Sequence, residues 1–399
     1  MTLHGQLNED FRPLAQLLTE QIESHGGGAA LCVYHRGEKV VDVWGGIASH
    51  DGQAWQSDTL ALSYSTGKGV LALLMHRLVD AGLLHYDDPV CRYWPEFAAN
   101  GKTSLTLRHL LCHEAGLYNI RALTEDAHDM LDWELMGQRL AAARPEHPPG
   151  QTWAYHALTF GWLLGHLAER VTGRPLAALL DEWVTQPLAL DGCYFGLPRH
   201  EFDRCADLIK TERSRPASAP RLSRLWLRAQ KRSVAGLHQL IGFPSASVAE
   251  GLEPIGIAGF DFNSAAVRQA CIPAANGIFT ARSLARLYAM LGDGGVWQGQ
   301  RLLQARIVEQ LSRVHNRGMG RVIALPLHWR LGYHRVFSFG VQPVHAYGHF
   351  GFGGSGAWTD PTRRLSLALT VNRGAGTPMG DLRLPRLNAC ALRIADQRS

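Results

Sequence analysis

The sequence predicts an α+β fold, in which a mixed domain is built from both ends of the chain and a mostly helical domain is inserted between them. Runs typical of strands cluster near both termini, whereas the middle of the chain, about 85–200, shows helical periodicity with short loops. The chain has 399 residues, of which 46% are hydrophobic and 19% charged, a composition typical of a globular protein of two or three domains. We assign residues 1–75 and 270–399 to the mixed domain and 76–269 to the helical domain.

The N-terminal segment predicts a helix followed by a β-hairpin. Asn8 is a favourable N-cap, and apolar residues follow it at spacings of three and four along one helical face: Phe11, Leu14, Leu18 and Ile22. Three glycines at 26–28 end this helix. Two apolar runs at 29–34 and 40–44 then flank a glycine-containing turn, which is the pattern of two paired strands.

The next segments predict buried helices. Residues 68–84 are apolar on nearly every side, as expected for a helix inside the core. Helical patterns follow at 105–112, 133–143 and 160–171, and Gly173 is a plausible C-cap for the last of them.

The C-terminal part returns to a mixed pattern. A helix is expected at 281–291 with Thr280 as its N-cap, and another at 385–394. Between them, short runs with strand character occur at 329–336, 339–345, 356–359 and 365–371.

One segment is compositionally distinct. Residues 199–232 contain ten Lys/Arg and four Asp/Glu, a balance of +6 that exceeds the +5 of the whole chain. Within it, Leu222, Leu225, Trp226 and Ala229 form an apolar helical face opposite the basic residues. We expect a lid-like basic insertion at about 199–250 with a solvated face; the alternative is a surface that touches anionic lipid or an acidic partner.

The net charge and the absence of targeting signals limit which macromolecules and membranes we expect the protein to bind. A net charge of +5 over 399 residues is too mild to indicate a nucleic-acid-binding protein. No run of 18 apolar residues and no signal peptide is visible, and the seven cysteines are scattered without a CxxC pair. We therefore expect no integral membrane segment, mostly buried free thiols and a cytoplasmic location. No cofactor is indicated, and the oligomeric state is not readable.

Ser65 and Lys68 are the centre of the functional prediction. They lie three residues apart where a polar turn enters the buried helix, so they share a face of its first turn. A serine hydroxyl needs a base to become a nucleophile, and a lysine one turn away can serve. The N-terminus of a helix also offers free N–H groups to a developing oxyanion.

Two further segments contain suitable chemistry. Tyr155 follows a Pro/Gly loop, and a lysine cation nearby would lower the pKa of its phenol and make a phenolate base accessible. The glycine-rich stretch 349–356 could bring a strand edge beside a nucleophile and supply a second oxyanion N–H. It also fits G-x-G-x-x-G, but it leads into residues 357–361 instead of a helix, which excludes a dinucleotide site.

Together these three segments resemble the serine β-lactamase and penicillin-binding-protein superfamily, and more closely its class C-like esterase branch, the family VIII carboxylesterases. The resemblance runs in order over most of the chain and includes the phrases at 105–117 and 192–198. It implies an antiparallel sheet flanked by N- and C-terminal helices, with an inserted mostly helical domain.

The resemblance also implies roles for individual residues. Ser65 would be the acyl-forming nucleophile, and Lys68 either the base or the cation that keeps Tyr155 ionised. Tyr155 would pass the proton to the leaving group and later activate water. The oxyanion hole would be formed by the backbone N–H groups of Ser65 and Phe352, the residue after His349-x-Gly351.

The chain departs from the β-lactamase pattern in two motifs. Tyr-x-Asn is replaced by residues 155–157, Tyr-His-Ala, and Lys-Thr-Gly by residues 349–351, His-Phe-Gly. The amide and the permanent cation that a β-lactam uses are therefore missing, because histidine is mostly uncharged at neutral pH. We expect hydrolysis of small neutral carboxylic esters; the alternatives are a β-lactamase, a D-amino-acid peptidase or an acyltransferase that uses the same acyl-enzyme.

Other enzyme classes fit less well. His109 and His113 have the spacing of a zinc-binding pair, but H-E-x-x-H is absent and no third ligand is evident, so no metal is expected. No serine satisfies G-x-S-x-G, although Ser355 comes nearest. A P-loop at Gly67-Lys68 lacks its first glycine and its Ser/Thr. An inactive binding protein of the same fold is not favoured, since all three motifs keep competent residues.

Overall fold

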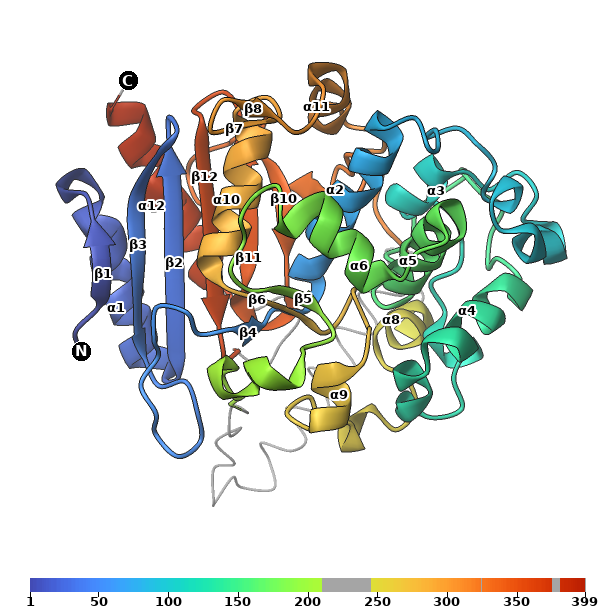
Figure 1. The fold of residues 1–399 in the computed structure, drawn as a ribbon, viewed down its shortest axis with the longest axis horizontal. Coiled ribbons are helices and arrows are strands. Elements are labelled where there is room, and N and C mark those ends of the chain that lie inside the picture. Colours follow the sequence, from blue (N-terminus) through green and yellow to red (C-terminus); the bar gives the residue numbers. More distant parts are fainter. Residues whose placement is uncertain (210–244, 324, 375–380, 399) are drawn as a thin grey trace.

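The fold is built on one antiparallel sheet that joins the two ends of the chain (Figure 1). The computed structural model describes residues 1–209, 245–323, 325–374 and 381–398. In the seven-stranded sheet the order is β1-β3-β2-β12-β11-β10-β9, so N-terminal β2 pairs with C-terminal β12. The strand bounds are β1 His4–Leu7, β2 Gly28–His35, β3 Glu38–Gly46, β9 His334–Arg335, β10 Tyr347–Phe350, β11 Gly356–Asp360 and β12 Leu365–Val371.

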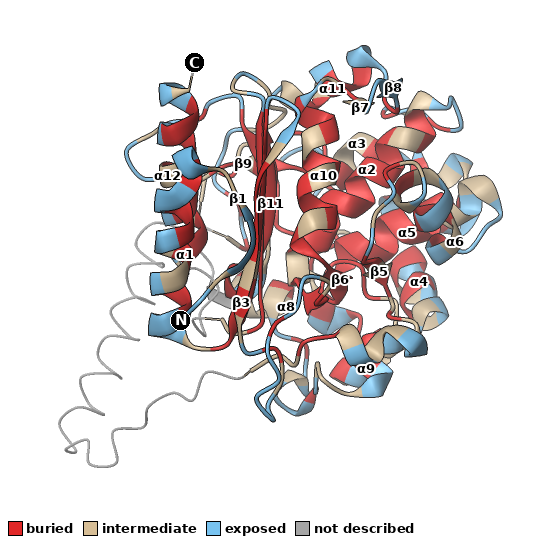
Figure 2. Ribbon diagram, turned by 60° about the vertical axis from the view of Figure 1, so that its left-hand side comes forward, coloured by how far each residue is buried: buried red, intermediate tan, exposed pale blue. Residues whose placement is uncertain are grey.

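Two terminal helices cover one face of this sheet (Figure 2). α1 (Arg12–His25) and α12 (Arg383–Gln397) contact each other, and their apolar faces bury Leu14, Leu18 and Leu387 against the strands. Inside this layer the indole Nε1 of Trp358 donates to Asn388 Oδ1 at 2.7 Å, which links β11 to α12. The expected flanking of the sheet by N- and C-terminal helices is therefore confirmed.

The other face carries α10 (Ala281–Gly292), and the helical part of the molecule lies beyond it (Figures 1 and 2). α2 (Gly67–Asp80) contacts both β10 and α5 (Thr159–Thr172), so it connects the sheet with the helices. The remaining helices are α3 Leu107–Leu111, α4 Trp133–Ala142, α6 Leu176–Leu180, α8 Ser245–Leu252, α9 Ala265–Gln269 and α11 Ala305–Ser312. Two small sheets consist of β4 Ala61–Leu62, β6 Gly277–Phe279 and β5 Cys193–Phe195, and of β7 Val296–Trp297 and β8 Gln300–Arg301.

Most predicted elements are confirmed. Asn8 caps the short 3₁₀ turn that leads into α1, Gly173 ends α5 in the left-handed conformation, and Thr280 caps α10 by accepting from Ser283 N–H. α2 is buried along nearly its whole length, because apolar residues occupy all of its sides.

Two strand predictions are wrong. Only residues 334–335 of the run 329–336 are in a strand, and 339–345 is a loop. Phe339 and Val344 are 49% and 67% exposed there, and Pro343 has no N–H to donate to a ladder. The strand after this loop is β10, Tyr347–Phe350, which overlaps the strand edge expected at 349–356.

Some expectations concern residues or properties that the fold does not test. The apolar face at 222–229 lies outside the described residues, and the domain boundaries stay predictions. Among the described residues, no helix is long and apolar enough to cross a membrane. All seven cysteines are free thiols, and Cys32, Cys112, Cys193 and Cys205 are buried.

Candidate active site

Ser65 lies at the junction of a 3₁₀ turn, Tyr64–Thr66, with the N-terminus of α2. The turn is fixed to the small sheet, because Ser63 N–H donates to Gly277 O at 2.8 Å. Ser65 is half-buried, and the residue before it, Tyr64, adopts a positive φ of 47°. The hydroxyl is therefore presented at the positive end of a fourteen-residue helix whose body is core.

Lys68 is fully buried and its amine faces Ser65. Nζ lies 2.8 Å from Ser65 Oγ, 2.7 Å from Ala157 O and 3.0 Å from Ala274 O. A neutral amine has two N–H groups and one lone pair. As an ammonium, Lys68 donates to all three oxygens, and the Ser65 hydroxyl is 3.4 Å from Ala274 O; as a neutral amine, it keeps two N–H groups for the carbonyls and a lone pair that can accept from Ser65 O–H.

Burial lowers the pKa of Lys68 well below its usual value of 10.5. Burial is the one cause of this shift, so no neighbouring carboxylate stabilises the ammonium. The site therefore favours the neutral amine, which is the form able to take a proton from Ser65.

Tyr155 is held in the loop between α4 and α5, with 6% of its surface exposed. Its ring stacks on Trp329 with 5.8 Å between centroids and an interplanar angle of 12°. The ring of His113 lies 5.1 Å away on centroids, and Lys68 Nζ lies 5.0 Å from the Tyr155 centroid. The structure thus brings together Ser65, Lys68 and Tyr155, as expected.

The protonation state of Tyr155 differs from the expectation. Burial raises the pKa of the Tyr155 phenol, and its hydrogen bond with Ser65 only partly opposes this shift. A lysine cation was expected to lower that pKa, but the same burial that favours the neutral phenol also favours the neutral amine. Tyr155 is therefore a protonated donor in the resting site instead of a phenolate.

The glycine-rich segment reaches the nucleophile through β10. β10 contacts the 3₁₀ turn that contains Ser65, and Gly351 follows directly at its end. A Cβ on Gly351 would lie 2.2 Å from Ser63 O and 2.9 Å from Thr66 Oγ1, so only glycine fits here. This close approach places the backbone at Phe352 beside the turn; the rings of Phe352 and Tyr64 are 5.3 Å apart on centroids.

His349 lies beneath this strand edge and is 1% exposed. Burial, together with His334 and Lys68, lowers the pKa of His349 well below 6.5. Its Nδ1 is 3.2 Å from Phe350 O, and its ring lies 6.3 Å from that of Tyr155 on centroids. His349 is therefore a neutral side chain packed behind Tyr155, which agrees with the missing cation inferred from the sequence.

Several residues around the site were not foreseen. Ala274 contributes a carbonyl to Lys68, and Trp329 supports the ring of Tyr155. His113 Nδ1 accepts from His156 N–H at 3.1 Å, which orients the loop that contains Tyr155. A backbone carbonyl and a packing partner distant in sequence leave no motif, so no signal could have identified Ala274 and Trp329, whereas His113 lies in the segment 105–117 that carries the resemblance.

The described residues contain one cluster with metal-ligand chemistry, and it lies apart from Ser65. Ligand atoms of Glu134, His166 and Glu169 fall within 4.8 Å of one another. Both oxygens of Glu169 already accept hydrogen bonds, from Trp133 Nε1 and Leu176 N–H. We interpret this cluster as a brace between α4 and α5. His109 instead belongs to the capping box of α3 and takes no part in a cluster with His113.

Comparison with known proteins places this arrangement in a family. The sequence profile described as Beta-lactamase matches residues 14–390. The chain belongs to the beta-lactamase family. The matched range includes the segments of Ser65, Tyr155 and His349, in the order that the resemblance required.

Individual relatives cover nearly all of the chain. The esterase/beta-lactamase LipL of Mycobacterium tuberculosis (strain ATCC 25618 / H37Rv) is 39% identical over 351 residues, which is 87% of this chain and 77% of LipL. The crystal structure of a family VIII carboxylesterase matches with a TM-score of 0.85 and 30% identity, covering 99% of this chain and 100% of that one. A penicillin-binding protein homolog from Caulobacter crescentus matches with a TM-score of 0.83 and 33% identity, covering 99% and 100%. The expected α+β fold of the β-lactamase and penicillin-binding-protein type is thus confirmed.

Proposed function

We propose that this chain is a carboxylesterase that hydrolyses small neutral esters through an acyl-enzyme on Ser65. The observation that carries the proposal is the setting of Lys68, whose buried amine lies 2.8 Å from Ser65 Oγ and has two backbone carbonyls as its other partners. The relatives named as an esterase/beta-lactamase and a family VIII carboxylesterase support the choice of ester chemistry.

The acylation step follows from these protonation states. Lys68 Nζ takes the hydroxyl proton as Ser65 Oγ bonds to the ester carbonyl carbon, and the carbonyl oxygen becomes an oxyanion. The N–H groups of Ser65 and Phe352 donate to that oxygen. When the intermediate collapses, the C–O bond to the alcohol breaks and Tyr155 O–H gives the departing alkoxide its proton. The Lys68 ammonium then returns its proton to the Tyr155 phenolate, which leaves a neutral amine and a neutral phenol beside the acyl-enzyme.

Deacylation reverses the roles. Water attacks the acyl carbon and gives a proton to Tyr155 Oη, while the phenol passes its own proton to the neutral Lys68 amine, so Lys68 is the net base. The second oxyanion collapses, the bond from the acyl carbon to Ser65 Oγ breaks, and Oγ regains its proton from the Lys68 ammonium as the acid leaves. An acceptor alcohol in place of water would give acyl transfer by the same step.

Neutral substrates are favoured by the charges around Ser65. Burial holds the pKa of His349 well below 6.5, and the pKa of Lys68 is lowered as well, so neither offers a permanent cation to a substrate carboxylate. Ala157 stands where the β-lactamase motif has asparagine, and it contributes only its carbonyl, to Lys68. A β-lactam or a D-amino-acid peptide would therefore lack two of the contacts that its carboxylate and side-chain amide need.

The test is hydrolysis of p-nitrophenyl butyrate by the wild-type protein and by Ser65→Ala and Tyr155→Phe, with a chromogenic cephalosporin in parallel. We expect ester hydrolysis to vanish in Ser65→Ala and to fall by about 10²–10⁴ in Tyr155→Phe, with little cephalosporin opening. Ser355→Ala is the matched control, because Ser355 Oγ is bound to the backbone of Val371 and has no base beside it. Full ester turnover in both Ser65→Ala and Tyr155→Phe would refute the proposal, and fast Ser65-dependent cephalosporin opening would make the chain a β-lactamase.

A further inference from the structure

Three aromatic rings gather beside the nucleophile. The ring of Tyr64 lies 5.3 Å from that of Phe352 and 5.3 Å from that of Phe262 on centroids, with interplanar angles of 78° and 62°. Both contacts are edge-on, which is a favourable geometry for aromatic pairs. Phe260 supports Phe262 from behind at 5.1 Å. We call Tyr64, Phe262 and Phe352 the aromatic wall.

The aromatic wall is linked along the chain to the residues proposed to react with the ester. Tyr64 directly precedes Ser65, and Phe352 supplies the second N–H of the proposed oxyanion hole. Two rings of the wall thus belong to residues at or next to the groups that would hold the ester carbonyl oxygen, and Phe262 is joined to them by its contact with Tyr64. Phe352 is 41% exposed, so a large aromatic surface is open at this place. An open apolar surface beside reacting atoms is typical of a ligand contact.

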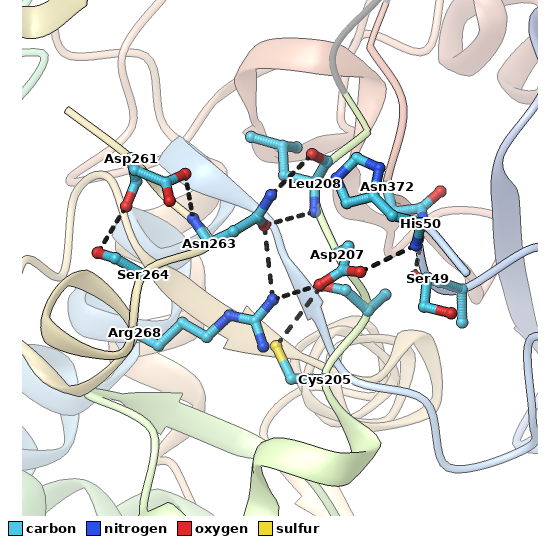
Figure 3. Close-up of polar contacts among 12 residues, drawn as sticks. Ser49, His50, Cys205, Asp207, Leu208, Asp261, Asn263, Ser264, Arg268 and Asn372 are labelled. Atoms are coloured by element: carbon cyan, nitrogen blue, oxygen red, sulfur yellow. Dashed lines mark hydrogen bonds and ion pairs between the residues drawn. The ribbon is translucent and has the colours of Figure 1, made fainter. Parts of the chain in front are cut away.

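A polar network holds the loop that contains Phe262 (Figure 3). Asn263 makes a two-point contact with Leu208, accepting from Leu208 N–H at 2.7 Å and donating to Leu208 O at 3.0 Å. Asp261 Oδ1 accepts from Asn263 N–H at 3.1 Å. Phe262 therefore stands between two residues that are each fixed by hydrogen bonds.

The same network is tied to the rest of the molecule on its far side (Figure 3). Arg268 Nη2 lies 2.9 Å from Asp207 Oδ1, and the other oxygen of Asp207 accepts from His50 N–H at 2.9 Å. Ile209 N–H donates to Asn372 O at 2.8 Å, next to the end of β12. Fixing the loop in this way before a ligand arrives reduces the ordering cost of binding.

We propose that the aromatic wall is a subsite for an aromatic group of the ester substrate, held in place by the Asn263–Leu208 contact. This proposal rests on the proposed function and names its substrate class, an ester with an aryl group in its acyl or its alcohol part. The wall offers ring edges and an exposed ring, and it contains no charged side chain. A flat neutral group is therefore the ligand that its chemistry matches.

The test compares matched esters that differ only in the aryl group. Methyl phenylacetate has its ring in the acyl part of the ester, and benzyl acetate has it in the alcohol part. The kcat/KM value for each is divided by the value for methyl acetate, which has no ring. We expect at least one ratio to be about tenfold or more in the wild type, and to fall about tenfold in Phe262→Ala and in Phe352→Ala. The second substitution keeps the backbone N–H. Phe339→Ala is the matched control, because Phe339 is similarly exposed, at 49%, but lies outside the wall.

The outcomes separate this proposal from the one on which it rests. Ratios near one in the wild type, or ratios that survive both substitutions, overturn the subsite while Ser65-dependent hydrolysis leaves the proposed function intact. A ratio that falls equally in Phe339→Ala also overturns the subsite. Hydrolysis that persists in Ser65→Ala overturns the proposed function and the subsite with it.

Discussion

Replacing Gly351 by alanine tests whether β10 sets the geometry of the proposed oxyanion hole. The new Cβ would lie 2.2 Å from Ser63 O, whereas carbon and oxygen normally approach to about 3.3 Å. The strand end and the turn that contains Ser65 must therefore separate by about 1 Å. A misplacement of that size costs about 10²-fold in rate, and loss of one oxyanion donor costs about 10²–10³-fold, or about 3–4 kcal/mol of transition-state stabilisation. We expect kcat for p-nitrophenyl butyrate to fall by about 10²–10³-fold.

The assay needs a measure of folding beside the rate. Overpacking of this kind destabilises a protein by about 1–3 kcal/mol, so Gly351→Ala should still be folded at 25 °C by circular dichroism. Gly318→Ala is the control, because a Cβ there meets no atom within 4 Å and its kcat should be unchanged. A folded Gly351→Ala enzyme with kcat within about threefold of the wild type would refute the argument that this approach of backbone to backbone determines catalysis.

Three further predictions concern protonation, the tyrosine and the sheet. Because the pKa of Lys68 is lowered and that of Tyr155 is raised, kcat/KM should rise with pH through the lowered pKa of Lys68 to a plateau that persists until the phenol ionises. Loss of activity between pH 7 and 9 would contradict the raised pKa of Tyr155. Unfolded Lys68 binds a proton that folded Lys68 lacks, so stability should increase with pH between the lowered pKa and 10.5, and urea titrations should find a smaller increase in Lys68→Met. Asn388→Ala leaves the buried Trp358 Nε1 and Phe337 O without partners, so we expect a loss of about 2–4 kcal/mol in denaturant unfolding with activity kept; an unchanged midpoint would show that these bonds contribute nothing.

The local parts of this protein were predictable from its sequence. The caps at Asn8 and Thr280, the helix end at Gly173 and the buried helix α2 depend on contacts a few residues apart, and the pattern of the chain reports such contacts directly. Ser65 and Lys68 belong to this class as well. Their separation of three residues at a helix start is enough to bring Oγ and Nζ together.

Strands were predicted less well, because a strand exists only where it finds a partner. The run 339–345 has the composition of a strand but pairs with no strand, and two of its apolar side chains, Phe339 and Val344, are exposed. The strand edge expected at 349–356 is β10, which covers Tyr347–Phe350 and ends before the glycines at 351, 353 and 354. It is a strand because β11 and β9 pair with it on both sides.

The sequence by itself determined which chemical groups are present and which short-range pairs they form. Only the tertiary structure decided their protonation states and the distant residues that contact them. The pKa of Lys68 is lowered because the fold buries its amine in a desolvated core, where its carbonyl partners Ala157 and Ala274 lie 89 and 206 residues away along the chain. Tyr155 stays protonated for the same reason, and Phe262 joins Tyr64 only through the folding of a distant loop. Desolvation and ring packing depend on everything that surrounds a group in space, and a one-dimensional pattern contains only what surrounds it along the chain.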